Sequence, residues 1–299
     1  MYFDVGNGHL VYYEEYGNPD GIKILFLHGG PGLGFSDADK ALFDPEKFYV
    51  LFVDQRGSGK SEPRGELAYN TTQDLLSDIN QILDHLKIES ITVFGGSWGA
   101  TLAVLYAAKN SNRVNRLILR GFFPATKECA DLLLRGKIKE SHPKEWKRIS
   151  SLVPVSHKGK EVEFFFDEIL QEGEGAYVLG KEWSRYGFSL SRKFFGEGEV
   201  DQIMDSVDVD LDRILIELNY ALNGFFISEG HVYKEASKVK DTPTTIIHGR
   251  YDYLCPPKEA QRLSELISGS QLILVDAGHS ITEISIKKAI QNALDKIKS

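Results

Sequence analysis

The chain has 299 residues and a formal net charge of −8 at pH 7, with no block of like charges, so nucleic-acid binding is not expected. Its two cysteines, Cys129 and Cys255, form no Cys-x-x-Cys pair, which argues against a disulfide framework and a cysteine-built zinc site and favours a reduced, cytoplasmic protein. Residues 1–10 do not resemble a secretion signal and no run approaches 18 apolar residues, so neither export nor a membrane partner is expected.

Short β-branched and aromatic runs followed by turn residues predict buried strands, with a more exposed extra strand over residues 10–16. The buried strands are expected over residues 23–27, 49–53, 91–94, 117–119, 244–247 and 272–275. Apolar residues spaced three and four apart predict helices over residues 72–86, 102–108, 259–267 and 282–297. This alternation is typical of an α/β fold with a mostly parallel sheet flanked by helices.

The middle of the chain has a different pattern. Residues 125–236 contain Glu- and Gly-rich breaks and amphipathic stretches such as 213–222, and the strand pattern resumes after Pro243. No long flexible linker flanks this region. We therefore predict an α/β core formed by residues 1–124 and 237–299, with residues 125–236 inserted as a helical cap.

A Gly-x-Ser-x-Gly motif lies between a predicted strand and a predicted helix, at residues 95–99. In this context the motif indicates a nucleophile elbow, a strained turn that holds the hydroxyl of Ser97 out into a cleft. The helix that follows directs its N–H groups and positive end toward the same place, which favours developing negative charge.

A serine nucleophile needs a base, and two residues beyond later strands fit the roles of acid and base. His279 is the candidate base and Asp252 the acid that orients its imidazole. The chain order Ser97, Asp252, His279 is that of α/β-hydrolases, so we expect this fold and a catalytic triad. Asp54 is an alternative acid, but it precedes the nucleophile and fits better as a residue that ties down its own turn.

A second glycine-rich turn follows the strand over residues 23–27 and reads His-Gly-Gly-Pro-Gly. Its backbone N–H groups can approach a substrate carbonyl, so Gly30, and next Gly29, are the predicted partners of the Trp98 N–H in an oxyanion hole. The Gly-Lys-Ser at residues 59–61 lacks the earlier glycine of a phosphate-binding loop, because Asp54 stands there. No nucleotide, metal or other cofactor is expected.

Together these motifs resemble those of the proline iminopeptidases, α/β-hydrolase peptidases that release N-terminal proline. The resemblance covers nearly all of both core segments. It is carried by residues 28–32, 42–45, 54–61, 70–72, 95–103, 119–121, 248–252 and 278–280. It implies a small peptide substrate with a free N-terminus.

The resemblance also implies substrate-binding residues. Glu217 matches one family glutamate that holds the substrate's amino group, whereas the other is replaced by Gly187. Glu172, Glu174 and Glu182 remain alternatives for a compensating carboxylate. Phe123 is expected to line the pocket for the proline ring. Three further residues in matching segments are expected at the substrate site: Arg120, Trp183 and Tyr186.

The leading hypothesis is a serine aminopeptidase that cleaves an N-terminal prolyl or similar small aminoacyl bond through an acyl-enzyme. An esterase or amidase for uncharged acyl compounds keeps the same triad and is the alternative. A catalytically silent binding module on this scaffold is a third hypothesis, and the sequence leaves the oligomeric state open.

Overall fold

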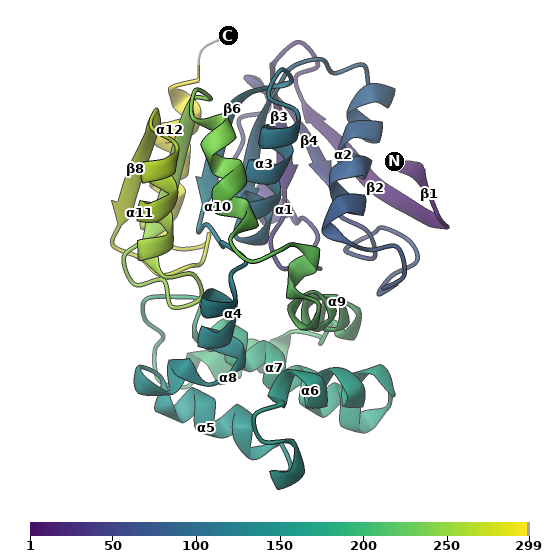
Figure 1. Ribbon diagram of the computed structural model, residues 1–299, viewed down its shortest axis with the longest axis vertical. Coiled ribbons are helices and arrows are strands. Elements are labelled where there is room, and N and C mark those ends of the chain that lie inside the picture. The colour runs from purple at the N-terminus through teal and green to yellow at the C-terminus, as the bar shows by residue number, and fades with distance from the viewer. Residues whose placement is uncertain (298–299) are drawn as a thin grey trace.

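The computed structural model describes residues 1–297, which form an eight-stranded sheet with helices on both faces and a helical layer below it (Figure 1). The strand order is β1-β2-β4-β3-β5-β6-β7-β8. The strands are β1 (Tyr2–Gly6), β2 (His9–Gly17), β3 (Ile22–Leu27), β4 (Phe48–Val53), β5 (Ile91–Gly96), β6 (Val114–Arg120), β7 (Thr244–Gly249) and β8 (Ser270–Val275).

The burial of the strands agrees with their directions in the sheet. From β4 to β8 every neighbouring pair is parallel, and β2 joins the sheet antiparallel to β4. All six residues of β4 are buried, as in a parallel strand covered on both faces, whereas β2 alternates toward solvent. The α/β-hydrolase fold predicted from the sequence is confirmed. The N-terminal strand β1, which pairs with β2, was not predicted, because its five residues are too few to show a clear strand pattern and only Val5 is buried.

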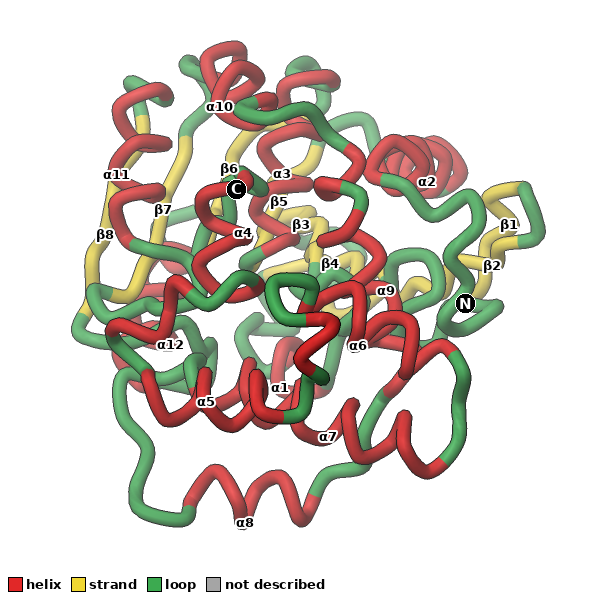
Figure 2. The backbone as a smooth tube through the Cα atoms, turned by 60° about the horizontal axis from the view of Figure 1, so that its bottom comes forward, coloured by secondary structure: helices red, strands yellow, loops and turns green. Residues whose placement is uncertain are grey.

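Two apolar layers hold helices against the sheet. One face packs against α2 (Thr72–His85), α3 (Trp98–Lys109), α10 (His231–Ala236) and α11 (Pro257–Leu266). On the other face, α12 (Ile284–Asp295) packs against the sheet together with Leu42 and Phe43, close to the short helix α1 (Asp37–Lys40). Figure 2 shows α2, α3 and α11 ranged along the same side of the strands. The turn at the start of α3 therefore belongs to a sheet that is packed on both faces.

The segment between β6 and β7 forms the layer seen below the sheet in Figure 1. Its α-helices are α4 (Lys127–Leu134), α5 (Pro143–Ser151), α6 (Glu161–Leu170), α7 (Glu174–Ser189), α8 (Glu199–Ser206) and α9 (Leu211–Leu222), before α10 returns to the core. These helices enclose an apolar cluster of their own around Phe165 and Trp183. The exact borders of core and cap at 124/125 and 236/237 stay a prediction.

Within residues 1–297, no helix has the length and apolar character needed to cross a membrane.

Candidate active site

Ser97 lies in the turn between β5 and α3, with φ 56° and ψ −119°, a backbone region that is costly for a residue with a side chain. The positions two residues before and two residues after Ser97 have room only for glycine. A Cβ at Gly95 would collide with the Gly99 carbonyl, and one at Gly99 would collide with the carbonyl of Leu27. The glycines of the motif are therefore required by the close approach of helix and strands, which projects the serine at the sheet edge.

The main chain around Ser97 is tied to the next strand. Its N–H donates to the carbonyl of Arg120 at the end of β6, at 2.8 Å. The first N–H groups of α3, beginning with Trp98, have no intrahelical acceptors because they stand at the start of the helix. A role of the Trp98 N–H as an oxyanion donor stays a prediction.

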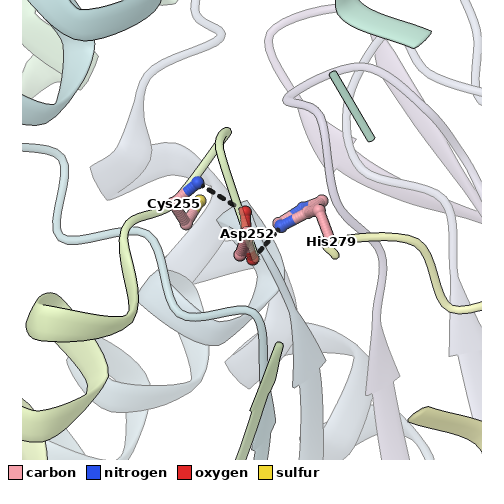
Figure 3. Close-up of side chains that lie close together, drawn as sticks. All are labelled: Asp252, Cys255 and His279. Atoms are coloured by element: carbon pink, nitrogen blue, oxygen red, sulfur yellow. Dashed lines mark hydrogen bonds and ion pairs between the residues drawn. The ribbon is translucent and has the colours of Figure 1, made fainter. Parts of the chain in front are cut away.

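Asp252 and His279 meet beyond the ends of β7 and β8 (Figure 3). His279 Nδ1 lies 2.7 Å from Asp252 Oδ2, and the other carboxylate oxygen accepts the N–H groups of Leu254 and Cys255 at 3.0 and 2.8 Å. Burial by itself raises the pKa of the Asp252 carboxyl, but the nearby imidazole of His279 and the hydrogen bonds outweigh it and hold the pKa below its usual range. An ionised Asp252 fixes the proton of His279 on Nδ1 and leaves Nε2 free to act as a base.

The imidazole also abuts the strand that anchors the nucleophile. Gly121 follows Arg120, has φ +57°, and a Cβ there would lie 2.9 Å from His279 Cε1. Ser97 and His279 both line one cavity of about 580 Å³ between the sheet edge and the cap. The structure thus brings the three predicted triad residues to one place, and their catalytic roles remain proposals.

The glycine-rich loop after β3 reaches the nucleophile. A Cβ at Gly29 would lie 3.3 Å from Ser97 Cβ, and both Gly29 and Gly30 line the cavity. His28 holds the loop: its Nε2 accepts the N–H of Gln55 at 3.0 Å, and the Gln55 side chain donates to the His28 carbonyl. Gln55 Oε1 also accepts the indole N–H of Trp98 at 3.0 Å, so one side chain joins the two predicted oxyanion segments.

Asp54 is not the carboxylate that binds the imidazole of His279. Its two oxygens accept the N–H groups of Phe35 and Lys60, both at 2.8 Å. The residue ties down its turn, as expected from the sequence.

The predicted substrate-binding residues all line the cavity, but their surroundings differ. Phe123 and Trp183 present apolar surface, and the Tyr186 hydroxyl donates to the Leu133 carbonyl at 2.8 Å. Arg120 is buried, and its guanidinium donates to the backbone carbonyl of His279 at 2.8 Å. This contact lets Arg120 support the histidine loop, and a role for Arg120 at the substrate site stays a prediction.

Glu217, on α9, is not a free carboxylate. Its Oε2 pairs with Arg213 Nη1 at 2.8 Å, and its Oε1 lies 3.3 Å from the indole nitrogen of Trp183. Gly187 lines the cavity without close neighbours. None of Glu172, Glu174 and Glu182 lines it, and Glu182 instead pairs with Arg148 in the cap. The carboxylates on the cavity wall besides Glu217 are those of Asp208 and Asp210.

Sequence reasoning missed two contacts around the triad and one on the cap. His248 Nε2 lies 3.3 Å from Asp252 Oδ2, and burial lowers the pKa of its imidazole. Ser191, in the cap, accepts the N–H groups of His279 and Ser280 at 2.8 and 2.7 Å. Arg213 was also missed, although its spacing of four from Glu217 on a helical segment was a usable signal.

One group of side chains has metal-ligand chemistry within the described residues: Asp252, Cys255 and His279 have ligand atoms within 4.8 Å of one another. The carboxylate is already taken up by the imidazole and two N–H groups. Burial and the adjacent Cys129 thiol raise the pKa of Cys255, which opposes the thiolate that a metal requires. The arrangement fits a triad better than a metal centre.

Comparison with known proteins agrees with this geometry. A family model described as alpha/beta hydrolase fold matches residues 23–284. The chain is 35% identical to a proline iminopeptidase of Arabidopsis thaliana over 99% of its own length and 78% of the plant protein. It is 33% identical to one of Neisseria gonorrhoeae, over 99% of this chain and 95% of the other.

The chain belongs to the proline iminopeptidase family of α/β hydrolases. Solved structures extend the likeness in fold alone. An esterase from Exiguobacterium antarcticum superposes with a TM-score of 0.67 at 22% identity, over 100% of this chain and 99% of the esterase. A hydrolase from Pseudomonas aeruginosa gives 0.70 at 16% identity, over 98% and 96%. The family resemblance drawn from the motifs is thus confirmed.

Proposed function

We propose that this protein is a serine aminopeptidase that hydrolyses the N-terminal prolyl, or similar small aminoacyl, bond of short peptides. The observation that carries the proposal is the ionised Asp252 bonded to His279 on the cavity that also exposes Ser97, in a chain of the proline iminopeptidase family. A peptide with a free N-terminus is the proposed partner, and the reaction needs no cofactor.

In the proposed mechanism, Ser97 Oγ attacks the scissile carbonyl while His279 Nε2 takes the hydroxyl proton. Asp252 holds the imidazole in the tautomer with Nδ1 protonated and stabilises the imidazolium that forms. Trp98 and Gly30 donate backbone N–H groups to the oxyanion. His279 then protonates the leaving amine, and water attacks the acyl-enzyme to release the amino acid and restore Ser97.

The cap supplies the end of the substrate site. Phe123 and Trp183 provide apolar surface for the ring, and Glu217 accepts the substrate's ammonium group, because each of its oxygens keeps a lone pair beyond the bonds to Arg213 and Trp183. Recognition of the free ammonium group by Glu217 limits cleavage to the bond after the terminal residue.

The test compares fluorogenic amides of L-proline, L-alanine and N-acetyl-L-proline. We expect hydrolysis of the first two, with proline preferred, and at least tenfold lower kcat/KM for the blocked substrate, because acetylation removes the charge that Glu217 accepts. The Ser97→Ala variant should lose about 10³-fold or more of kcat/KM. Substantial hydrolysis by purified Ser97→Ala would refute the mechanism.

An esterase for uncharged acyl groups is the second candidate. It is favoured by one observation: the cavity wall has Gly187 where a second carboxylate would stand, and its remaining glutamate is paired with Arg213. Preference for the N-acetylated over the free prolyl substrate would support it.

A further inference from the structure

Arg213 contributes a positive charge to the wall of the active-site cavity, at the place where Glu217 faces the substrate. Its guanidinium bridges two cap helices: Nη1 pairs with Glu217 on α9 at 2.8 Å, and Nη2 donates to the Ser184 hydroxyl on α7 at 2.9 Å. Both partners line the same cavity. The guanidinium is therefore held in position and is not a freely moving surface charge.

The start of α9 is also close to the reacting groups. A Cβ at Gly32, in the glycine-rich loop, would lie 2.8 Å from the Arg213 carbonyl and 3.3 Å from Ile216 Cβ. The helix that bears Arg213 and Glu217 thus packs directly on the loop that offers the oxyanion donors. The two charges are therefore carried by a helix in contact with the loop that lies beside Ser97.

The other charges of the cavity wall have different partners. Asp210 pairs with Arg64 at 2.7 Å, and the Arg120 guanidinium, which also lines the cavity, donates to the backbone carbonyl of His279. Asp208 is exposed at the rim. Arg213 is accordingly the guanidinium on the described cavity wall that neutralises a carboxylate facing the substrate.

We propose that Arg213 determines substrate selectivity by competing with the substrate's ammonium group for the Glu217 carboxylate. This inference rests on the proposed function and concerns the same subsite. The pair exposes 18% of the Arg213 side chain and 31% of the Glu217 side chain, so solvent screens it only in part. A bound ammonium must share Glu217 with a cation already in place. An uncharged acyl group does not compete with Arg213 for Glu217. Arg213 therefore reduces the difference in affinity between amine-bearing and neutral ligands.

The test measures binding without turnover, in the Ser97→Ala background, by isothermal titration calorimetry. The ligands are L-prolinamide and cyclopentanecarboxamide, which differ by a charged ring amine in place of a methylene group. The variants are Arg213→Met, which keeps an apolar stem, and Arg64→Gln as the control. Arg64 lies outside the cavity lining and pairs with Asp210 and Asp212, so its removal deletes a nearby positive charge without releasing Glu217.

We expect Arg213→Met to bind L-prolinamide about three- to tenfold more tightly, a change of the size expected for a partly exposed ion pair. Its affinity for cyclopentanecarboxamide should stay within twofold of the parent. Arg64→Gln should change neither ligand by more than twofold. Arg213→Gln, which also removes the charge, should show the same gain for L-prolinamide and covers the case in which the methionine variant does not fold. Arg213→Lys, which retains the charge, should stay close to the parent.

Weaker binding of L-prolinamide to Arg213→Met would show that Arg213 orients Glu217 for the amine and would overturn the competition. Equal changes for both ligands, or no change in either, would overturn it as well, as would failure of both to bind the parent. The proposed function fails on a different result, namely no cleavage of prolyl amides by the wild-type enzyme.

Discussion

At the carboxyl edge of the sheet, Gly95, Gly99 and Gly121 stand where an added methyl group would strike backbone or the imidazole, whereas Gly187 and Gly175 in the cap have open space around them. At the edge that carries Ser97, Asp252 and His279, the three glycine positions therefore accept no larger residue without a shift of the surroundings. The cap wall tolerates change, and its charges are arranged in pairs such as Arg213 and Glu217. On the proposed roles, the difference means that tightly packed backbone positions the groups for bond cleavage, whereas a few side chains on a less crowded surface select the substrate.

The largest effect is expected at the acid of the triad. Asp252→Asn should lower kcat/KM by about 10³- to 10⁴-fold, because an amide favours the wrong imidazole tautomer. Steady-state kinetics with a prolyl amide and a neutral ester should show the same loss for both. Asp54→Asn is the matched control, since Asp54 holds only its own turn, and it should keep more than a tenth of the activity. A loss below tenfold in Asp252→Asn would remove the proposed triad.

Gly121→Ala tests the packing of the edge. The new Cβ would lie 2.9 Å from His279 Cε1 at φ +57°, so the imidazole must shift, and a displacement near 1 Å costs about 100-fold in kcat. Gly175→Ala, on α7 with open space, should leave kcat unchanged and raise the free energy of unfolding by up to about 1 kcal/mol. Similar kinetics for the two variants would break the contrast between edge and cap.

Glu217→Gln tests the cap wall. It removes the carboxylate and leaves the Arg213 guanidinium unpaired beside the substrate's ammonium, so KM for L-prolyl amides should rise about tenfold or more while KM for a neutral ester stays within twofold. Asp208→Asn, a change of equal charge on the cavity rim, is the control. An equal rise of KM for both substrates would refute selective recognition of the amine.

Gly187→Glu sharpens the same comparison in the opposite direction. The position is helical, lines the cavity and has no heavy atom within 4 Å of an added Cβ, so the side chain is accommodated. A second carboxylate should lower KM for L-prolyl amides about fivefold, with kcat little changed. Matched measurements on the neutral ester decide whether the gain is electrostatic, because that KM should not fall.

The smallest effect concerns pH and stability. Burial lowers the pKa of His28 and of His248, so the unfolded chain binds protons more readily than the folded chain. The two histidines contribute fully to the free energy of unfolding above the pKa of the unfolded state, about 6.5. This contribution is lost as the pH falls toward the lower pKa of the folded state, and the loss at pH 5.5 is at most about 1.4 kcal/mol per histidine. Urea unfolding at pH 7.5 and 5.5 should show this loss, and it should be smaller in His248→Gln. A pH-independent free energy of unfolding would contradict it.

The sequence by itself determined the architecture and indicated the three residues of the proposed triad. Apolar runs such as residues 49–53 indicated buried parallel strands, because a strand covered on both faces has no polar positions. The order of Ser97, Asp252 and His279 indicated their convergence, because parallel strands end at the same edge of a sheet. The start of α3 at Trp98 agrees with the prediction of a helix directly after the Gly-x-Ser-x-Gly turn. Other helix ends were predicted less well: the helix expected over residues 282–297 spans Ile284–Asp295.

Only the tertiary structure decided which polar side chains meet across the chain. It placed Arg120 behind His279, the Ser191 carbonyl against the histidine loop, and the Cys129 thiol, from α4, beside Cys255. It also kept Glu172, Glu174 and Glu182 out of the cavity and brought Asp208 to it. Local periodicity reports the face of an element that is buried, whereas contacts between distant segments depend on how helices pack in the cap. The packing of the cap helices produces no periodic pattern in the amino-acid sequence.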